Sequence, residues 1–442
     1  MPVLISFAAL FFSIFLVQLG SGSLGPLDAL AGAARGFTTG EIGLMGSAHF
    51  AGFFVGCWLA PRLIGQIGHS RAFAAAAAVG AMGALLHPVF EGPYYWAALR
   101  VLTGVAIASA YTVVESWMQA KVENRNRGRV FGVFRVVDLA GQITAQALIA
   151  VLDPASYAAY NIVAAFCCLC LLPLTLTRRM PPLTPNAPRL RPLKALKLSP
   201  TACLGIVVAG LTGAAFRMVG PIYAVEAGLD PTGIALFLSA AVFGGIAAQY
   251  PVGWLADKVD RRAVLLGISG VAVLACLGLM AWMDPGDHNS LYLGAFVFGV
   301  TAYPVYSVSA AYANDRAPAD FIVELNAALV FFFSVGAIVS PLASAELITA
   351  YGPAALFGFA AAAHLVLFAF TLYRMSQRSP VRPTAPYRYM PRTSMVLARL
   401  FKRDGGENGN GNGRPHAGAG MGGGADQQAP APRVADAEET PR

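Results

Sequence analysis

Long apolar runs recur along this 442-residue chain, and they constrain its fold more than any other feature. A bilayer core of about 30 Å requires roughly 20 apolar residues in a helix. Because backbone groups cannot stay unpaired in lipid, we predict that each run forms a transmembrane helix. The predicted spans are 4–31, 40–60, 72–89, 94–118, 130–151, 156–176, 200–226, 232–254, 263–283, 289–312, 323–347 and 354–375.

The composition agrees with a membrane protein. Apolar residues make up 56% of the chain and charged residues only 12%, while the 47 glycines suit close helix packing. The net charge of +8 does not indicate a nucleic-acid partner, because the basic residues fall in short loops. All six cysteines lie in apolar runs without zinc-site spacing, so we expect no metal or cofactor. The first run lacks a basic leader, which favours an uncleaved span over a signal peptide.

Composition also divides the chain into four parts. We predict an N-terminal six-helix bundle at 1–176, a cytoplasmic basic linker at 177–199, a C-terminal six-helix bundle at 200–375 and a cytoplasmic disordered tail at 376–442. From residue 405 onward the tail is too polar and glycine-rich to bury a core. Apolar and basic residues alternate over 392–403, which fits either a short helix on the anionic inner leaflet or a disordered segment.

Basic residues predict the orientation. Lys and Arg crowd into the loops on one side of the predicted spans, whereas the other side carries only Arg35. The positive-inside rule therefore places both termini in the cytoplasm of a multi-pass protein in the bacterial inner membrane.

The two halves contain similar short sequences. Gly25-Pro26-Leu27 recurs as Gly220-Pro221-Ile222, 195 positions later, and Gly104 and Tyr111 recur as Gly299 and Tyr306 at the same separation. Leu59-Ala60-Pro61-Arg62 recurs as Leu255-Ala256-Asp257-Lys258, 196 positions later. These matches predict two parallel six-helix repeats, and hence an all-α membrane protein with twelve transmembrane helices.

A charged segment interrupts the apolar runs at 253–262. Gly253 allows close helix approach, Asp257 is expected near the start of the next helix, and three basic residues mark the cytoplasmic side: Lys258, Arg261 and Arg262. The segment resembles the loop signature G-x-L-A-D-[RK]-x-[GD]-R-[RK] of the major facilitator superfamily. The resemblance implies a gating loop between helices 8 and 9, and a substrate site between the halves.

The first-half copy of this loop departs from the signature. It reads Gly56-Cys57-Trp58-Leu59-Ala60-Pro61-Arg62 and then Gly68-His69-Ser70-Arg71, so proline replaces the acid in a longer loop. The contacts that keep the cytoplasmic side closed should therefore be weaker here, or be made by other residues. Glu115-Ser116-Trp117, Asn126-Arg127-Gly128-Arg129-Val130 and Gly65-x-x-Gly68-His69-x-Arg71 are most similar to the YcaD-like bacterial branch of the superfamily. That resemblance covers about 375 residues and implies a fold but no substrate.

Ionisable residues inside predicted spans are candidate site residues, because burying a charge in a membrane is costly. Arg100 followed by Gly104 resembles the superfamily motif R-x-x-x-G, which implies proton coupling or support of the cavity. A structural arginine bound to backbone carbonyls is the alternative. Arg217 and Asp28 lie in the predicted outer half, where they could contact each other, or Asp28 could lie at headgroup level.

The predicted inner half carries two acids and a polar stripe. Arg135 could neutralise Asp138 one turn away, which would make Asp138 structural; an unpaired Asp138 would be a proton carrier, and Glu115 is a second candidate. Gln142 and Gln146 extend the stripe from Asp138 along span 5, which favours a cavity face. Weaker candidates are aromatic or polar: Tyr111, Tyr303, Tyr306, Gln249 and His49.

These features predict a secondary active transporter. We expect a monomer that moves a small solute by alternating access, with protons as the coupling ion and the lipid bilayer as its surroundings. The alternatives are a passive facilitator or channel-like uniporter, and a membrane-embedded enzyme such as an acyltransferase. The enzyme is disfavoured because H-E-x-x-H, a His–Cys pair and a Walker loop are missing from the sequence.

Overall fold

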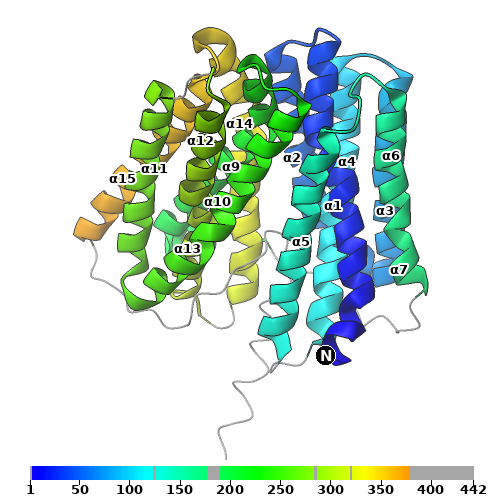
Figure 1. Ribbon diagram of the computed structural model, residues 1–442. Helices are drawn as coiled ribbons and strands as arrows, with labels where there is room; N and C mark the ends of the chain where they lie inside the picture. The colour runs from blue at the N-terminus through cyan, green and yellow to red at the C-terminus, as the bar shows by residue number, and fades with distance from the viewer. Residues whose placement is uncertain (1, 123–125, 177–189, 283–285, 319–320, 378–442) are drawn as a thin grey trace, which may run out of the picture. The chain divides into compact units, whose positions relative to one another are not determined.

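Long helices build the described part of the chain (Figure 1). The computed structural model describes residues 2–122, 126–176, 190–282, 286–318 and 321–377, and these contain no strand. The helices are α1 (Pro2–Ala34), α2 (Thr39–Ile67), α3 (His69–Leu86), the 3-10 helix η1 (His87–Val89), α4 (Pro93–Lys121), α5 (Arg127–Ile149), α6 (Tyr157–Leu169), α7 (Leu171–Leu176), α8 (Pro192–Leu198), α9 (Pro200–Glu226), α10 (Pro231–Lys258), α11 (Arg261–Trp282), α12 (His288–Ala302), α13 (Pro304–Asn314), α14 (Ile322–Tyr351) and α15 (Ala355–Gln377).

Local sequence explains where the helices begin and end. At the start of α2, the Thr38 hydroxyl accepts a hydrogen bond from the Glu41 backbone, and the Glu41 carboxylate accepts one from the Thr38 backbone. This capping box satisfies two backbone N–H groups that the first helical turn leaves unpaired. At the other end of α2, Gly68 adopts a φ of 82°, which glycine tolerates best, and α3 begins at the next residue.

Eleven segments among the described residues are long and apolar enough to cross a membrane. Three of them combine shorter helices: α3 with η1, α6 with α7, and α12 with α13, which meet at Tyr303 and Pro304. The remaining predicted span, 130–151, forms the helix α5, which is not one of these eleven segments. The count of twelve spans therefore stays a prediction, in which α5 is the additional span.

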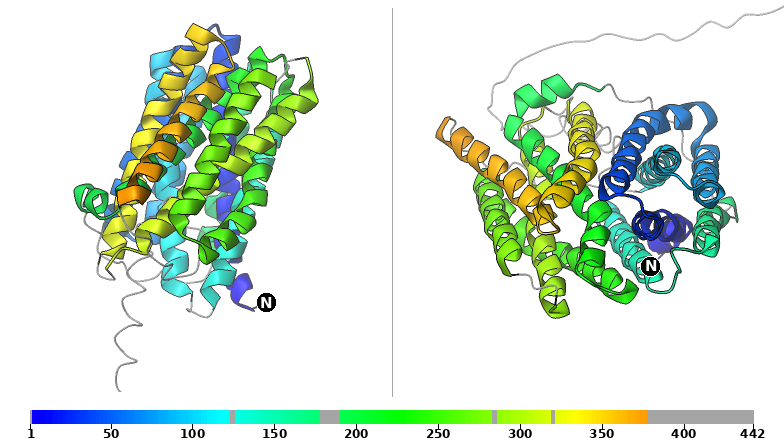
Figure 2. Two further views of the ribbon diagram at one scale, coloured as in Figure 1. Left: turned by 90° about the vertical axis from the view of Figure 1, so that its left-hand side faces the viewer. Right: turned by 90° about the horizontal axis from the view of Figure 1, so that it is seen from above.

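The helices form two neighbouring groups, α1–α7 and α9–α15, as the view from above shows (Figure 2). Equivalent glycines bring equivalent helices together in both groups. Gly52 and Gly104 lie where α2 and α4 touch, and Gly244 and Gly299 lie where α10 and α12 touch. At each of these glycines a Cβ atom would collide with the backbone of the facing helix. The predicted correspondence of Gly104 with Gly299 thus has a structural counterpart.

The first residues of equivalent helices show that the predicted offset between the two repeats is wrong in spans 1 and 2. Thr39 and Pro231 begin α2 and α10, and His69 and Arg261 begin the next helices; each pair is 192 positions apart. The turn glycines Gly36 and Gly228, with φ of 80° and 78°, have the same separation. The matches at 195 positions in span 1 and at 196 in span 2 are therefore out of register, because such short apolar strings recur by composition alone.

The corrected register changes the first-half copy of the charged segment. Pro61 lies inside α2, which continues to Ile67, so the connection to α3 is the single residue Gly68 rather than a longer loop. Gly65, and not Pro61, is then 192 positions before Asp257. His69 occupies the place of Arg261 at the start of the following helix.

The two groups contact each other closely through α2 and α14. A Cβ atom on Gly43 would lie 2.7 Å from the carbonyl oxygen of Pro341 and 2.5 Å from Cβ of Ala345. Ser47 on α2 accepts a hydrogen bond of 3.2 Å from the backbone of Leu342. These contacts lie toward the end of the bundle that the sequence predicts to face outward, which we call the outer end.

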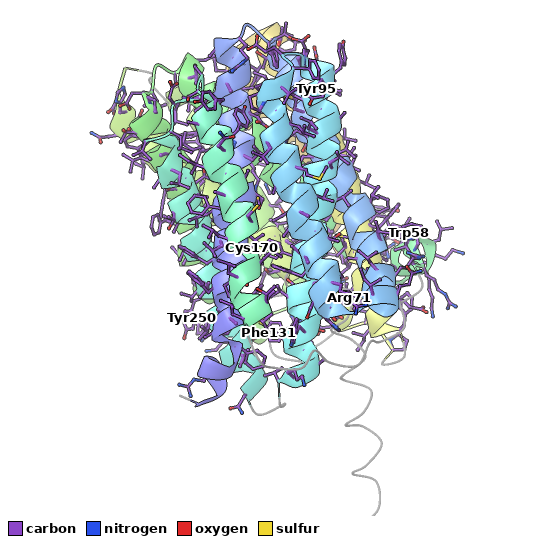
Figure 3. All side chains as sticks on the ribbon, turned by 90° about the vertical axis from the view of Figure 1, so that its right-hand side faces the viewer. Trp58, Arg71, Tyr95, Phe131, Cys170 and Tyr250 are labelled. Atoms are coloured by element: carbon purple, nitrogen blue, oxygen red, sulfur yellow. The ribbon has the colours of Figure 1, made fainter. Side chains whose placement is uncertain are left out.

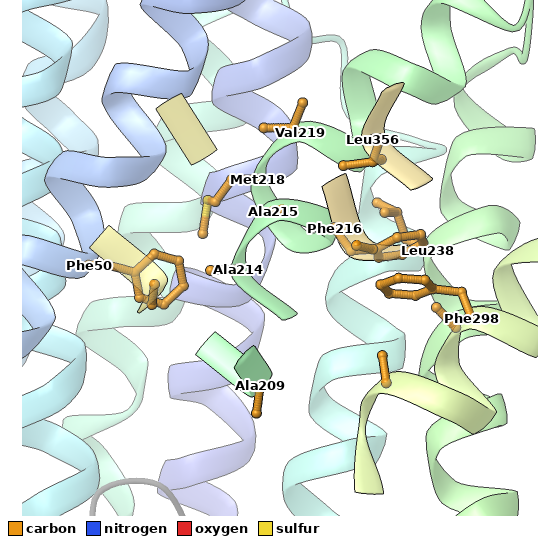
Figure 4. Packing of buried hydrophobic residues seen from close by; sticks show 14 of the residues in the cluster. Phe50, Ala209, Ala214, Ala215, Phe216, Met218, Val219, Leu238, Phe298 and Leu356 are labelled. Atoms are coloured by element: carbon orange, nitrogen blue, oxygen red, sulfur yellow. The ribbon is translucent and has the colours of Figure 1, made fainter. Parts of the chain in front are cut away.

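Helix α9 adds to the same contact. Met218 lies on the side of α9 that faces α1 and α2, next to Phe50, whereas Phe216 packs in the opposite direction with Leu238 and Phe298 (Figure 4). The rings of Phe216 and Phe298 are stacked with 4.6 Å between centroids. The core of the second group and the contact between the groups are therefore built from opposite faces of one turn of α9.

The described end of the linker packs against the second group. Arg191 forms an ion pair of 3.4 Å with Glu324 of α14, and Lys194 of α8 lies 4.0 Å from the ring centroid of Phe321. Residues 177–189 and 378–442, with most of the predicted linker and tail, lie outside the described residues.

Candidate functional site

The charged segment 253–262 belongs to two helix ends. Asp257 lies in the last turn of α10, not at the start of the next helix as the sequence predicted. Asp260 takes that place, because its carboxylate accepts a hydrogen bond of 2.9 Å from the backbone of Arg262. The difference arises because α10 continues through the charged residues to Lys258, whose ammonium group lies 3.9 Å from the ring centroid of Trp254.

Arg261 joins this helix connection to α13. Its guanidinium donates a hydrogen bond of 2.9 Å to Asp315 and lies 3.4 Å from Asp257. The Arg261 and Asp315 side chains are buried, whereas Asp257 is 37% exposed. The strongest partner of Arg261 is therefore Asp315, which the sequence analysis did not single out.

In the first group, a buried polar cluster surrounds Asp28. The cluster consists of Asp28 on α1, His87 on η1, Arg100 on α4 and Tyr160 on α6, and we call it the Asp28 cluster. Oδ2 of Asp28 lies 3.3 Å from Nε2 of His87 and 3.6 Å from Nε of Arg100. The Tyr160 hydroxyl donates a hydrogen bond of 3.1 Å to the other carboxylate oxygen.

The Asp28 cluster corrects one predicted pairing. Asp28 is 2% exposed, and its ion-pair partners are Arg100 and His87 rather than the predicted Arg217. Its carboxylate faces side chains of three other helical elements: η1, α4 and α6. Arg100 receives its acidic partner, Asp28, from another helix, α1.

Arg100 also reaches the second group of helices. Its Nη2 atom lies 3.7 Å from the sulfur of Met218 on α9. Arg100 is 1% exposed, and its Nη1 atom has no hydrogen-bond partner among the described residues. One guanidinium group thus connects the Asp28 cluster to the contact between the two groups.

A second polar cluster surrounds Asp138 on α5, and we call it the Asp138 cluster. Gln18 on α1 donates a hydrogen bond of 2.9 Å to Oδ1 of Asp138, and Tyr111 on α4 donates to the same oxygen. Arg135, one turn earlier on α5, pairs with Oδ2. The neutralisation of Asp138 by Arg135, which would make Asp138 structural, is therefore present.

The remaining candidates on α9 and α5 are one arginine and two glutamines. Arg217 is half-buried on α9 and acts electrostatically on both Tyr111 and His49 of the first group. Gln146 is buried, and its Oε1 atom has no hydrogen-bond partner among the described residues, whereas Gln142 is half-buried. Arg217 thus brings a positive charge of the second group close to polar residues of the first.

Glu115 and Tyr306 are the two remaining candidates, on α4 and α13. Glu115 is 2% exposed and acts electrostatically on Cys57, while its neighbour Ser116 forms a hydrogen bond of 3.0 Å with His69. Tyr306 is buried with its ring edge against Phe333, and the ring centroids are 5.7 Å apart.

Several residues of these clusters were missed in the sequence. His87 and Tyr160 lie near the ends of predicted spans, where polar residues are common, and Gln18 is an isolated amide in an apolar run. A signal for His87 exists, because it interrupts an apolar stretch just before Pro88. Its role emerges only when α1, α4 and α6 surround it.

Side chains at the molecular ends agree with the arrangement of the helices. Tyr95 and Arg71 lie toward opposite ends of the first group, and Trp58 projects from its surface (Figure 3). The Arg62 guanidinium lies 3.7 Å from the ring centroid of Trp58, much as Lys258 covers Trp254. Tryptophan with a basic neighbour is typical of the membrane–water interface.

Curated proteins with similar sequences are uncharacterized bacterial transporters. The curated relatives include an uncharacterized MFS-type transporter of Enterobacter sp. (strain 638), which is 26% identical over 346 residues, or 78% of this chain and 89% of the relative. YcaD of Escherichia fergusonii, another uncharacterized MFS-type transporter, is 27% identical over 347 residues with the same coverage.

Solved structures show the same fold at low sequence identity. The nucleoside transporter NupG superposes with a TM-score of 0.70 at 17% identity, covering 84% of this chain and 99% of NupG. A bacterial homolog of the human lysosomal transporter Spinster, inward-facing and occupied, superposes with a TM-score of 0.68 at 12% identity, covering 87% and 98%. The family model described as Major Facilitator Superfamily matches residues 10–320 and 202–405, so this multi-pass membrane protein belongs to the major facilitator superfamily of transporters.

Proposed function

We propose that the protein is a secondary active transporter that moves a small solute across the bacterial inner membrane by alternating access, coupled to protons. The observation that carries the proposal is the placement of Arg217. This half-buried cation of the second group acts electrostatically on Tyr111 and His49 of the first group, and Tyr111 donates a hydrogen bond to Asp138. Charged and polar groups from both halves therefore meet in an otherwise apolar bundle.

This arrangement suits a solute with polar groups of both signs. Asp138 and Gln18 offer carboxylate and amide groups, and Arg217 offers guanidinium donors. Buried polar groups of this kind orient a ligand within a mostly apolar site. Because Asp138 is paired with Arg135, its role in this proposal is to hold the geometry of the polar site rather than to carry the coupling proton.

Binding is the first test. Purified protein would be screened by thermal shift against nucleosides, amino acids, sugars and organic acids, because a ligand that binds the native state raises its melting temperature. Nucleosides belong in the panel because NupG is a nucleoside transporter, although 17% identity transfers only the fold. A ligand at 100 times its dissociation constant should stabilise the protein by about 2.7 kcal/mol.

Transport is the second test. Radiolabelled hits would be offered to proteoliposomes with an imposed proton gradient, with and without a protonophore. We expect accumulation that collapses with the gradient and is lost in Arg217→Gln and Asp138→Asn. Thr175→Ala is the matched control, since its hydroxyl bonds only to carbonyls of its own helix turn. Uptake that equilibrates without accumulation, whatever the gradient, would establish the passive facilitator instead.

A further inference from the structure

The hydrogen bonds of His87 determine which of its ring nitrogens carries a proton. Nδ1 of His87 lies 2.5 Å from the carbonyl oxygen of Gly83. A carbonyl oxygen can only accept a hydrogen bond, so Nδ1 must be the donor and carry its hydrogen. A neutral imidazole has one N–H group, and Nε2 of neutral His87 is therefore a bare lone pair.

That lone pair faces another acceptor. Nε2 lies 3.3 Å from Oδ2 of Asp28, and an ionised carboxylate can only accept. Neither atom forms a hydrogen bond to any described residue, and both side chains are buried, with exposed fractions of 0% for His87 and 2% for Asp28. Two acceptors facing each other repel, whereas one proton between them would make the contact favourable.

We propose that Asp28 and His87 form a binding site for a single proton. Adding a proton to Nε2 creates an imidazolium that faces the carboxylate, and no other bond forms or breaks. The inference deepens the proposed function, because it rests on proton-coupled transport for its purpose and identifies where the coupling proton is held. It assigns that role to the Asp28 cluster rather than to Asp138.

The surroundings of the pair support a site that gains and loses its proton. The ring of Tyr160 stacks on His87 at 13° with 5.3 Å between centroids, and such an aromatic face stabilises a cation. Arg100 opposes a second positive charge, because it already shares Oδ2 of Asp28 at 3.6 Å. The carboxylate and the ring favour the proton while the guanidinium disfavours it, so neither protonation state is locked.

The other charged or titratable side chains around the pair are more distant. Arg35 on α1 acts electrostatically on Tyr160, but it is paired with Glu91 at 3.2 Å. From α2, His49 contacts the backbone of Arg100, and Arg217 on α9 acts on His49. From α4, only Arg100 faces Asp28 directly.

The site also lies where its charge can affect the second group of helices. Arg100 bridges Asp28 and the sulfur of Met218 on α9, with 3.7 Å between Nη2 and Sδ. When His87 takes up a proton, Asp28 is shared between two cations instead of one. The ion pair that positions Arg100 then weakens, which connects the proton to the contact between the halves.

Trp96 provides a built-in reporter for the test. Its ring centroid lies 5.4 Å from that of His87, and an imidazolium quenches a neighbouring tryptophan more strongly than a neutral imidazole does. The fluorescence of purified, substrate-free protein would be titrated between about pH 4.5 and 9. We expect a one-proton transition that disappears in Trp96→Phe and in His87→Gln. A second buried pair, His69 with Trp117 at 5.9 Å, gives the matched control His69→Gln, which should leave that transition in place.

Two variants should move the midpoint of the transition in opposite directions. Asp28→Asn removes the anion that stabilises the imidazolium, so the midpoint should fall by at least about one pH unit, a tenfold loss of proton affinity. Tyr160→Phe keeps the stacked ring but removes the hydrogen bond to the carboxylate, so the midpoint should rise. The loss of a single hydroxyl keeps the test available even if Asp28→Asn fails to fold.

Each result decides the proposal. A transition that persists in His87→Gln, or a midpoint that neither Asp28→Asn nor Tyr160→Phe changes, would overturn it. Because no substrate is present, failure here is distinct from failure of the proposed function. If the pH transition is observed but no compound is transported, the proton site is supported and the transporter proposal is refuted.

Discussion

The backbone N–H of Leu342 on α14 donates a hydrogen bond of 3.2 Å to the side-chain hydroxyl of Ser47 on α2. Leu342 follows Pro341, the proline inside α14, and the bond joins the two groups of helices near the outer end. A contact between the halves at this point stabilises the conformation that is closed on the outside, and it must break if that side opens.

Ser47→Ala should shift the protein toward the conformation open on the outside. Loss of one neutral hydrogen bond weakens the closed state by about 0.5–1.5 kcal/mol, which is about two- to tenfold in the equilibrium. Distances between spin labels at Tyr94 and Tyr351, two exposed residues of α4 and α14, would measure the shift. Ser344→Ala is the control, because Ser344 bonds only within α14. Equal distance distributions in wild type and Ser47→Ala would contradict the role.

Gly43→Ala should have a larger effect of the same sign. Its Cβ atom would lie 2.7 Å from a backbone oxygen of α14, so the closed contact becomes overpacked at a penalty of about 1–3 kcal/mol. Gly65→Ala on the same helix is the matched control, since a Cβ there would meet nothing within 4 Å. The labels at Tyr94 and Tyr351 would measure the population of the closed conformation in both variants. If Gly43→Ala is closed as often as Gly65→Ala, the steric argument is wrong.

Asp315→Ala should destabilise the protein more than Asp257→Ala. Removing Asp315 leaves the buried Arg261 guanidinium without its closest partner, which typically costs about 3–5 kcal/mol. Asp257 is 37% exposed and its pair is worth about 0–1 kcal/mol. Melting temperatures of the two purified variants provide the comparison. If Asp257→Ala melts at the lower temperature, the assignment of Asp315 as the main partner is wrong.

Asp28 and Arg100 should show strong coupling in a double-mutant cycle. Either substitution alone, Asp28→Asn or Arg100→Ala, removes one partner of a buried ion pair and leaves the other charge unmatched. The double variant removes both charges of the pair. The double variant should therefore be more stable than the sum of the single effects predicts, by about 0.5–3 kcal/mol. Denaturation of all four proteins in one detergent tests this, and strictly additive losses would mean that the pair contributes no coupling.

The apolar runs were sufficient to predict the helices, because a segment in lipid must satisfy its own backbone hydrogen bonds. The same argument explains the exception. Span 130–151 forms α5, but Arg135 and Asp138 lower its apolarity, so it is not among the segments that qualify on composition. These two charges pair with each other inside α5, and Gln18 of α1 and Tyr111 of α4 donate hydrogen bonds to Asp138.

By itself, the amino-acid sequence determined the family, the helices, the glycine contacts of Gly104 and Gly299, and the presence of unusual charges inside the spans. Only the tertiary structure decided which charges pair. Asp28 could have met Arg217 or Arg100, and the choice depends on how each helix is rotated about its axis. His87 became part of a site because four elements, distant in sequence, converge on it. Local sequence sets a helix and its ends, whereas the neighbours of a buried side chain follow from packing across the whole bundle.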